Sequence, residues 1–102
     1  MVRMSSVLFV MLKSPHESSN LELIPNLAEG SKKGAILFED AVYFAVQKKA
    51  AKHLSEHLDE IYVIAEDLAA RGFAGCAAGK FKTIDYGQAV DLIMDYDRTI
   101  AI

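Results

Sequence analysis

Residues 60–93 read EIYVIAEDLAARGFAGCAAGKFKTIDYGQAVDLI, and this stretch decides the fold. The run from Ile61 to Ile64 has the composition of a β-strand, and a short helical stretch follows it and stops at Arg71-Gly72. A second strand-like run, Phe81 to Asp85, leads into a helix that begins near Tyr86. Strand, helix, strand and helix in this order are typical of crossover units on a parallel sheet.

Three further strand-like runs lie outside this stretch. Residues 7–12, VLFVML, show no polar alternation, which indicates burial on both faces, and Gly34 to Phe38 and Thr99 to Ile102 are similar but shorter. The sequence therefore predicts a single α/β domain over residues 1–102, with a mainly parallel sheet of four or five strands flanked by helices. The predicted core residues are Leu8, Val10, Ile36, Phe38, Tyr62, Ile64, Phe81 and Ile84.

Two helices are expected between the early strands. One begins at Ser19 or Asn20 and carries apolar residues as far as Ala28, with Pro25 shortening or kinking it. The other runs from Ala41 to about Leu58, where apolar residues recur at intervals of three and four. Gln47 and Lys48 could mark a break between two shorter helices.

Composition excludes several classes of protein. The net charge is −3 and no Lys/Arg run is longer than two residues, so a direct nucleic-acid binder is not expected. The longest apolar run near the N-terminus has six residues, too short for a secretory signal or a membrane span. A single cysteine rules out an internal disulfide framework and indicates a cytoplasmic setting. The hydrophobic fraction of 52% leaves room for an interface with other subunits.

Polar side chains follow each of the main predicted strands, and in a parallel sheet they meet at one edge. Together they could bind a ligand, a cation or a basic partner, or raise one another's pKa values. The favoured interpretation is structural, with Asp40, Asp67 and Asp85 capping helices. Ser14 with His16 could suggest a nucleophile and a base, but a structural loop is preferred there. The candidate ligand-binding or partner-binding residues are Ser14, Glu39, Asp40, Glu66, Asp67 and Asp85. No metal and no cofactor is expected.

Two other patterns have a chemical and a structural interpretation. Cys76 has small neighbours and could accept sulfur, with Lys80 or Arg71 favouring its thiolate, but a structural or incidental cysteine is preferred because its segment leads back toward the start of a strand. His53, Glu56 and His57 match the H-x-x-E-H pattern of inverted zinc peptidases. A solvated helix face is preferred, because catalytic zinc normally takes three protein ligands.

Several short segments in a fixed order resemble the TusB/DsrH family of small sulfur-relay subunits. They are Lys13-Ser14-Pro15-x-Glu17, Glu29-Gly30, LFEDAVYFAV at residues 37–46, EDLAARG at residues 66–72 and IDY at residues 84–86. The resemblance covers about residues 6–95. It implies the fold shared by DsrE-, DsrF- and DsrH-type proteins, and cytoplasmic assembly with paralogous DsrE/TusD-like and DsrF/TusC-like subunits. It also implies the handling of persulfide sulfur, either toward 2-thiouridine in tRNA or in sulfur oxidation.

The resemblance does not supply a sulfur-carrying cysteine. In the family this residue usually belongs to the DsrE/TusD-type subunit, in a region that corresponds to Val63 to Asp67 here, and some DsrH-type members have a cysteine near the position of Ile24. This chain has a cysteine at neither place. The sequence therefore predicts a non-catalytic relay subunit that forms homo-oligomers when alone. The alternatives are an independent sulfurtransferase that uses Cys76, and a stand-alone homo-oligomer that binds a small ligand.

Overall fold

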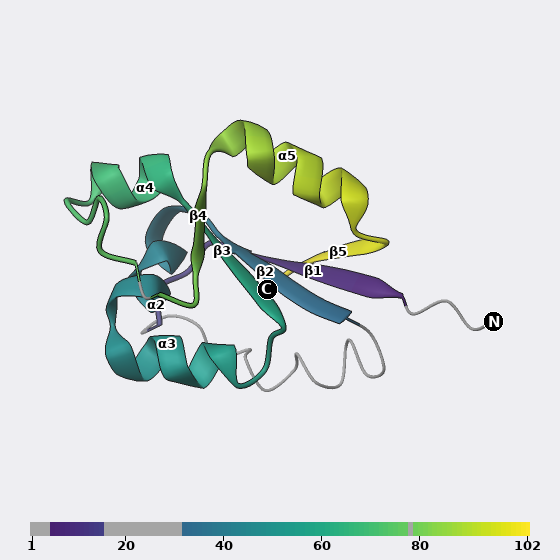
Figure 1. Cartoon of the computed structure of the whole chain (residues 1–102), viewed down its shortest axis with the longest axis horizontal. Helices are drawn as coiled ribbons and strands as arrows, with labels where there is room; N and C mark the ends of the chain where they lie inside the picture. The colour runs from purple at the N-terminus through teal and green to yellow at the C-terminus, as the bar shows by residue number, and fades with distance from the viewer. Residues whose placement is uncertain (1–4, 16–31, 78) are drawn as a thin grey trace.

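A computed structural model of the chain describes residues 5–15, 32–77 and 79–102. In these residues a parallel sheet carries helices on both faces (Figure 1). The strands are β1 (Ser6–Met11), β2 (Lys32–Leu37), β3 (Glu60–Ile64), β4 (Lys82–Ile84) and β5 (Arg98–Ala101). The helices are the 3₁₀ helix η1 (Glu39–Val42) and the α-helices α2 (Tyr43–Val46), α3 (Lys48–Ser55), α4 (Ala65–Ala70) and α5 (Tyr86–Asp95). No helix in these ranges has the length and apolar character needed to cross a bilayer.

The strands are arranged in the order β4-β3-β2-β1-β5, and every neighbouring pair is parallel. The predicted fold class is thus confirmed. Phe9 of β1 pairs with Ala35 of β2 on one side and with Ile100 of β5 on the other, so β1 is an interior strand, as its uninterrupted apolar run indicates. Because all strands run the same way, their carboxyl ends lie at one edge of the sheet.

The two faces of the sheet carry two separate apolar clusters. Phe9 points to one face, in a cluster that also contains Phe44 of α2 and Leu54 of α3. Leu8, the preceding residue, points to the other face and shares its cluster with Ala89 of α5. Figure 1 shows α5 on one side of the sheet, and α2 and α3 on the other. The alternation of side chains along each strand therefore buries both faces of β1.

The core prediction is correct for Leu8, Ile36, Tyr62, Ile64, Phe81 and Ile84, which are buried. It is wrong for Val10, which is only partly buried, whereas Phe38 is partly buried but packs against the cluster on the α5 face. Most of the predicted residues belong to the face covered by α5, and α5 itself contributes a single buried residue, Ala89. Side chains at the margin of this face consequently keep some exposure. Of the larger cluster on the opposite face, the prediction included only Phe81.

The helix expected from Ala41 to Leu58 is divided at Gln47, whose φ of −104° and ψ of 116° are extended. The break that the sequence allowed at Gln47 is therefore confirmed, and α3 ends at Ser55. The helical segment also begins earlier than expected, with η1 at Glu39. The helix expected between residues 19 and 28 lies outside the described residues.

Charged and aromatic side chains join the amino-terminal ends of β2 and β3. Lys32 forms an ion pair with Glu60, and Glu60 also accepts a hydrogen bond from the Tyr62 hydroxyl. The contacts with Lys32 and then Tyr62 lower the pKa of Glu60, and the contact with Glu60 raises the pKa of Lys32. The Lys32 ammonium lies 5.8 Å from the ring centroid of Tyr96, which follows α5.

Gly34 of β2 leaves the space that the Tyr96 ring occupies. A Cβ atom at position 34 would lie 2.8 Å from Cζ of Tyr96 and still closer to its hydroxyl, so the two groups would overlap. The missing side chain lets the residue that ends α5 lie directly against the sheet.

We expect Glu60→Gln to destabilise the protein at neutral pH and to have little effect in acid. The pKa of Glu60 in the folded state is below its ordinary value of 4.5, so its carboxylate stabilises the fold above pH 4.5 and this contribution is lost as the pH falls through the lowered pKa. The expected loss at pH 7 is about 0.5–1 kcal/mol, because the ion pair is partly exposed. Urea unfolding of both proteins from neutral pH downward measures it, and a difference that stayed constant with pH would contradict it.

Candidate functional site

Polar side chains gather where β2, β3 and β4 end. We call this group the carboxyl-edge cluster; its members are Glu39, Asp40, Glu66, Asp67, Arg71, Asp85 and Tyr86. The convergence follows from the topology, because these three strands are adjacent and parallel and each passes directly into a helix. It includes five of the six candidate residues that the sequence pointed to. The sixth, Ser14, lies just beyond the carboxyl end of β1, the strand next to β2, and is half-buried.

Asp67 is the centre of the carboxyl-edge cluster. Its side chain is 7% exposed, and it is the one buried charged residue within the described ranges. Its Oδ2 accepts a hydrogen bond from the backbone N–H of Glu39 at 2.7 Å, and its Oδ1 accepts one from the Tyr86 hydroxyl. One carboxylate of α4 thereby contacts the segments that follow β2 and β4. Buried charges need such partners, because an unpaired one is costly to desolvate.

Glu39 has a backbone conformation that its bond to Asp67 helps to hold. Its φ is +49°, in the left-handed region that residues with a side chain rarely adopt. The strain is offset because the same conformation directs the Glu39 N–H to the buried carboxylate. The chain can therefore turn sharply from β2 into η1.

Arg71 joins the ends of two segments. Its Nε and Nη2 both donate to Oδ1 of Asp40 at 3.0 Å, and its Nη1 donates to the backbone carbonyl of Asp67 at 3.2 Å. Asp40 and Arg71 thus form an ion pair that links η1 to the end of α4. Arg71 was not among the candidate residues predicted from the sequence. Its position four residues after Asp67 places the two residues on one side of the helical segment, and this spacing could have indicated that Arg71 lies near the cluster.

Tyr86 completes the cluster from the first turn of α5. Its ring stacks on Phe38, with centroids 6.3 Å apart and planes 15° from parallel, and its backbone N–H donates to Oε2 of Glu66 at 3.3 Å. The hydrogen bond to Asp67 raises the pKa of Tyr86 to about 12, so its phenol stays protonated and keeps donating from neutral pH into the alkaline range.

The helix-capping prediction is right for one of its three residues. Asp85 caps α5: its Oδ1 accepts from the Gln88 N–H at 2.7 Å, and Gln88 returns a bond to the Asp85 N–H at 3.0 Å. The prediction is wrong for Asp40 and Asp67, which lie in the first turns of η1 and α4 and do not cap their own helices; Asp67 instead accepts from the N–H of Glu39, the first residue of η1. The apolar residues Phe38 and Ile64 occupy the cap positions of these helices, so the acidic side chains fall beyond the cap position and bind other segments.

The remaining candidates lie apart from this cluster. Cys76 is exposed in the loop between α4 and β4, where its thiol lies 3.7 Å from the carbonyl oxygen of Ala74. His53 and His57 pack edge to face, 5.2 Å between centroids, but α3 ends at Ser55, so the H-x-x-E-H residues do not share one continuous helix. His16 lies outside the described residues. Within those residues, no three His, Cys, Asp or Glu side chains are grouped so as to hold a metal ion.

The chemistry available at the carboxyl edge is that of recognition. The carboxylates of Asp40, Glu66, Asp67 and Asp85 and the phenol of Tyr86 are engaged with one another, with Arg71 or with backbone N–H groups. The cluster also presents the partly exposed ring of Tyr86 beside the exposed residues Glu39 and Glu66. Such an arrangement is rigid, because each of its segments is bound to another through a side chain. It suits contact with a partner better than it suits nucleophilic attack.

Comparisons with known proteins agree with the fold. The family model described as DsrH-like protein matches residues 13–99. The crystal structure of the ychN protein from E. coli superimposes with a TM-score of 0.78, covering 97% of this chain and 100% of that one at 12% sequence identity. At this identity the likeness shows a shared fold. No curated protein sequence matches this chain significantly.

We expect Asp67→Asn to destabilise the protein by about 2 kcal/mol, because one of two hydrogen bonds to a buried carboxylate is lost and the other weakens. The same change should lower the pKa of Tyr86 from about 12 toward 10.0. Ultraviolet titration of the tyrosines measures this shift, and Tyr86→Phe identifies which component belongs to Tyr86. An unchanged Tyr86 titration in the Asp67→Asn protein would show that the hydrogen bond is not formed.

Proposed function

Because this chain belongs to the DsrH-like family over residues 13–99, we propose that it is a non-catalytic subunit of a cytoplasmic sulfur-relay complex. The membership confirms the resemblance found in the sequence, and with it the sulfur-relay class of protein. The proposal concerns the role of the chain within that class. The chain supports the transfer of persulfide sulfur by partner subunits, toward tRNA 2-thiouridine synthesis or sulfur oxidation. It has no catalytic activity alone.

The observation that carries this proposal is the absence of a thiol at the junction of β3 and α4, residues 63–67. This is the region where the resemblance implies the sulfur-carrying cysteine of DsrE/TusD-type subunits. Here Val63 and Ile64 are fully buried, and the Asp67 carboxylate is taken up by Glu39 and Tyr86. The junction therefore has a structural role in the fold, and we infer that the transferring thiol comes from another chain.

An apolar surface on α5 supports association with such partners. Its residues are Tyr86, Val90, Ile93 and Met94, which are 45%, 56%, 37% and 80% exposed and which we call the α5 stripe. They recur at intervals of three and four and therefore share one side of the helix. A contiguous exposed apolar patch of this kind marks an interaction surface. The proposed occupants are the paralogous DsrE/TusD-like and DsrF/TusC-like subunits, or a second copy of the chain when it is produced alone.

A second candidate function rests on the exposure of Cys76. An accessible thiol is one requirement of a sulfur acceptor, so the chain could act as an independent sulfurtransferase. The other requirements are thiolate character and a nearby transfer partner, and no basic side chain forms a hydrogen bond with this thiol in the part of the chain that the structure describes. A stand-alone ligand-binding homo-oligomer is the third candidate, and failure to co-purify with related subunits would favour it.

We expect Val90→Glu and Met94→Glu to weaken self-association by about tenfold or more, because each would bury a charge in an apolar contact. His53→Glu, which makes the same change in charge on the exposed side of α3, should leave association unchanged. Light scattering and sedimentation at micromolar concentration measure the effect. A wild-type chain that stayed monomeric, alone and together with related subunits, would rule out the α5 stripe as an interface.

We expect Cys76→Ser to leave sulfur transfer largely intact in an assembly reconstituted with DsrE- and DsrF-type subunits. The reason is that Cys76 lies in the α4–β4 loop and not at the β3–α4 junction. Mass spectrometry after treatment with a persulfide donor provides a second readout. If the wild-type chain gains one sulfur atom, and Cys76→Ser abolishes both this adduct and transfer, the independent sulfurtransferase is the correct function.

A further inference from the structure

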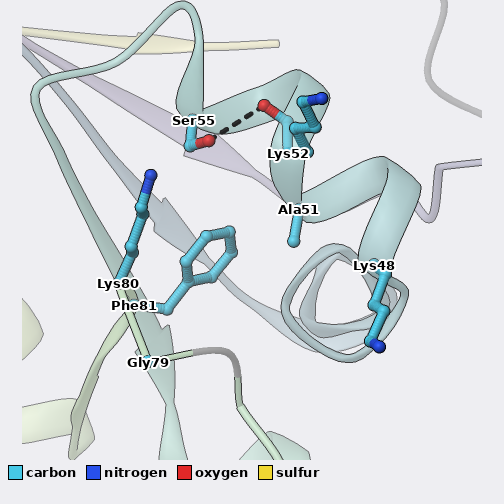
Figure 2. A pocket seen from close by; sticks show the side chains of 7 residues that line it. All are labelled: Lys48, Ala51, Lys52, Ser55, Gly79, Lys80 and Phe81. Atoms are coloured by element: carbon cyan, nitrogen blue, oxygen red, sulfur yellow. Dashed lines mark hydrogen bonds between the residues drawn. The ribbon is translucent and has the colours of Figure 1, made fainter.

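A cavity of about 260 Å³ lies where α3 faces the start of β4 (Figure 2). Its lining comes from two segments far apart in the sequence: residues Lys48, Ala51, Lys52 and Ser55 of α3, and Gly79, Lys80 and Phe81. It is separate from the carboxyl-edge cluster and shares no residue with it. We call it the α3 cavity.

The floor of the α3 cavity is apolar. Phe81 and Ala51 are 6% and 7% exposed and belong to the large core cluster, so they keep their place whether or not the cavity is filled. Figure 2 shows the Phe81 ring beside the Ala51 methyl group, with the lysine chains around them. A flat apolar group could therefore rest on the Phe81 ring.

The rim of the α3 cavity is positively charged. Lys48 and Lys52 are one helical turn apart on α3, and Lys80 approaches from the other segment. Among the residues that the structure describes, no acidic side chain lines the cavity, and the ion pairs found there, Lys32–Glu60 and Arg71–Asp40, leave these three lysines out. In Figure 2 the ammonium groups of Lys48 and Lys52 point away from the Phe81 ring and that of Lys80 lies on the other side of the ring; all three stand on flexible stems that can turn toward a ligand. Three cations around one cavity stand out in a chain whose net charge is −3.

We propose that the α3 cavity binds a small organic phosphate, that is, a phosphate monoester joined to a flat apolar group. The apolar group would rest on Phe81, and Lys52 and Lys80 would neutralise the phosphate, which carries nearly two negative charges at neutral pH. The size of the cavity is just below the roughly 300–1,000 Å³ of pockets for drug-sized ligands, so a small molecule fits better than a folded partner. This site does not depend on the proposed relay function.

Phenyl phosphate is the test ligand, because it joins the two required groups in a small molecule. In an NMR titration of the full chain at constant ionic strength, it should shift the amide signals of Ala51, Lys52, Ser55, Lys80 and Phe81 and reach saturation. Inorganic phosphate lacks the ring and phenol lacks the charge, so each should bind at least about tenfold more weakly than phenyl phosphate. Equal binding of inorganic phosphate, or shifts confined to the α5 stripe, would overturn the proposal.

Matched lysine variants test the rim. Lys52→Met and Lys80→Met remove a charge but keep an apolar stem, and each should weaken phenyl phosphate binding about fivefold to tenfold. Lys49→Met is the control, because Lys49 is an exposed neighbour on α3 that does not line the cavity, and its effect should stay within about twofold. The amide spectrum of each free variant checks its fold. An equal loss in Lys49→Met, or no saturation by about 10 mM ligand with the wild type, would overturn the site.

Discussion

The buried carboxylate of Asp67 is the contact on which the carboxyl edge of the sheet depends. It receives hydrogen bonds from the segment that follows β2 and from the first residue of α5, while its own helix follows β3. Three chain segments that leave the sheet at neighbouring strand ends are thereby held by one side chain. A neutral residue could not replace it at low cost, because the Glu39 N–H, fixed by its left-handed backbone, would lose a charged acceptor.

The surfaces assigned to association and to ligand binding lie on opposite faces of the sheet. Figure 1 shows α5, which carries the α5 stripe, on one side and α3 on the other. A subunit seated on α5 would leave the α3 cavity accessible. The carboxyl-edge cluster lies where the strands end and contributes Tyr86 to the stripe, so a partner bound to α5 would also contact the region braced by Asp67.

Local patterns predicted the sheet and one helix cap, whereas contacts between distant segments could not be read from the sequence. The alternation of strand-like and helical runs predicted a mainly parallel sheet. Asp85 was expected as a cap because Asp is common at helix N-termini, and its partner Gln88 lies only three residues away. Asp67 binds Glu39 and Tyr86, which are 28 and 19 residues distant, so its role required the folded backbone. The α3 cavity was missed for the same reason: Lys52 and Lys80 become neighbours only when β4 takes its place in the sheet.

The fit of Tyr96 over Gly34 couples the evolution of two positions that are far apart in the chain. A larger residue at position 34 could be accepted only if the side chain at position 96 became smaller at the same time, because the two side chains would otherwise overlap. Tyr96 directly follows α5, so any such exchange would change how that helix rests on the sheet. Relatives that replace this glycine should accordingly present their last helix, and whatever binds to it, at a different angle.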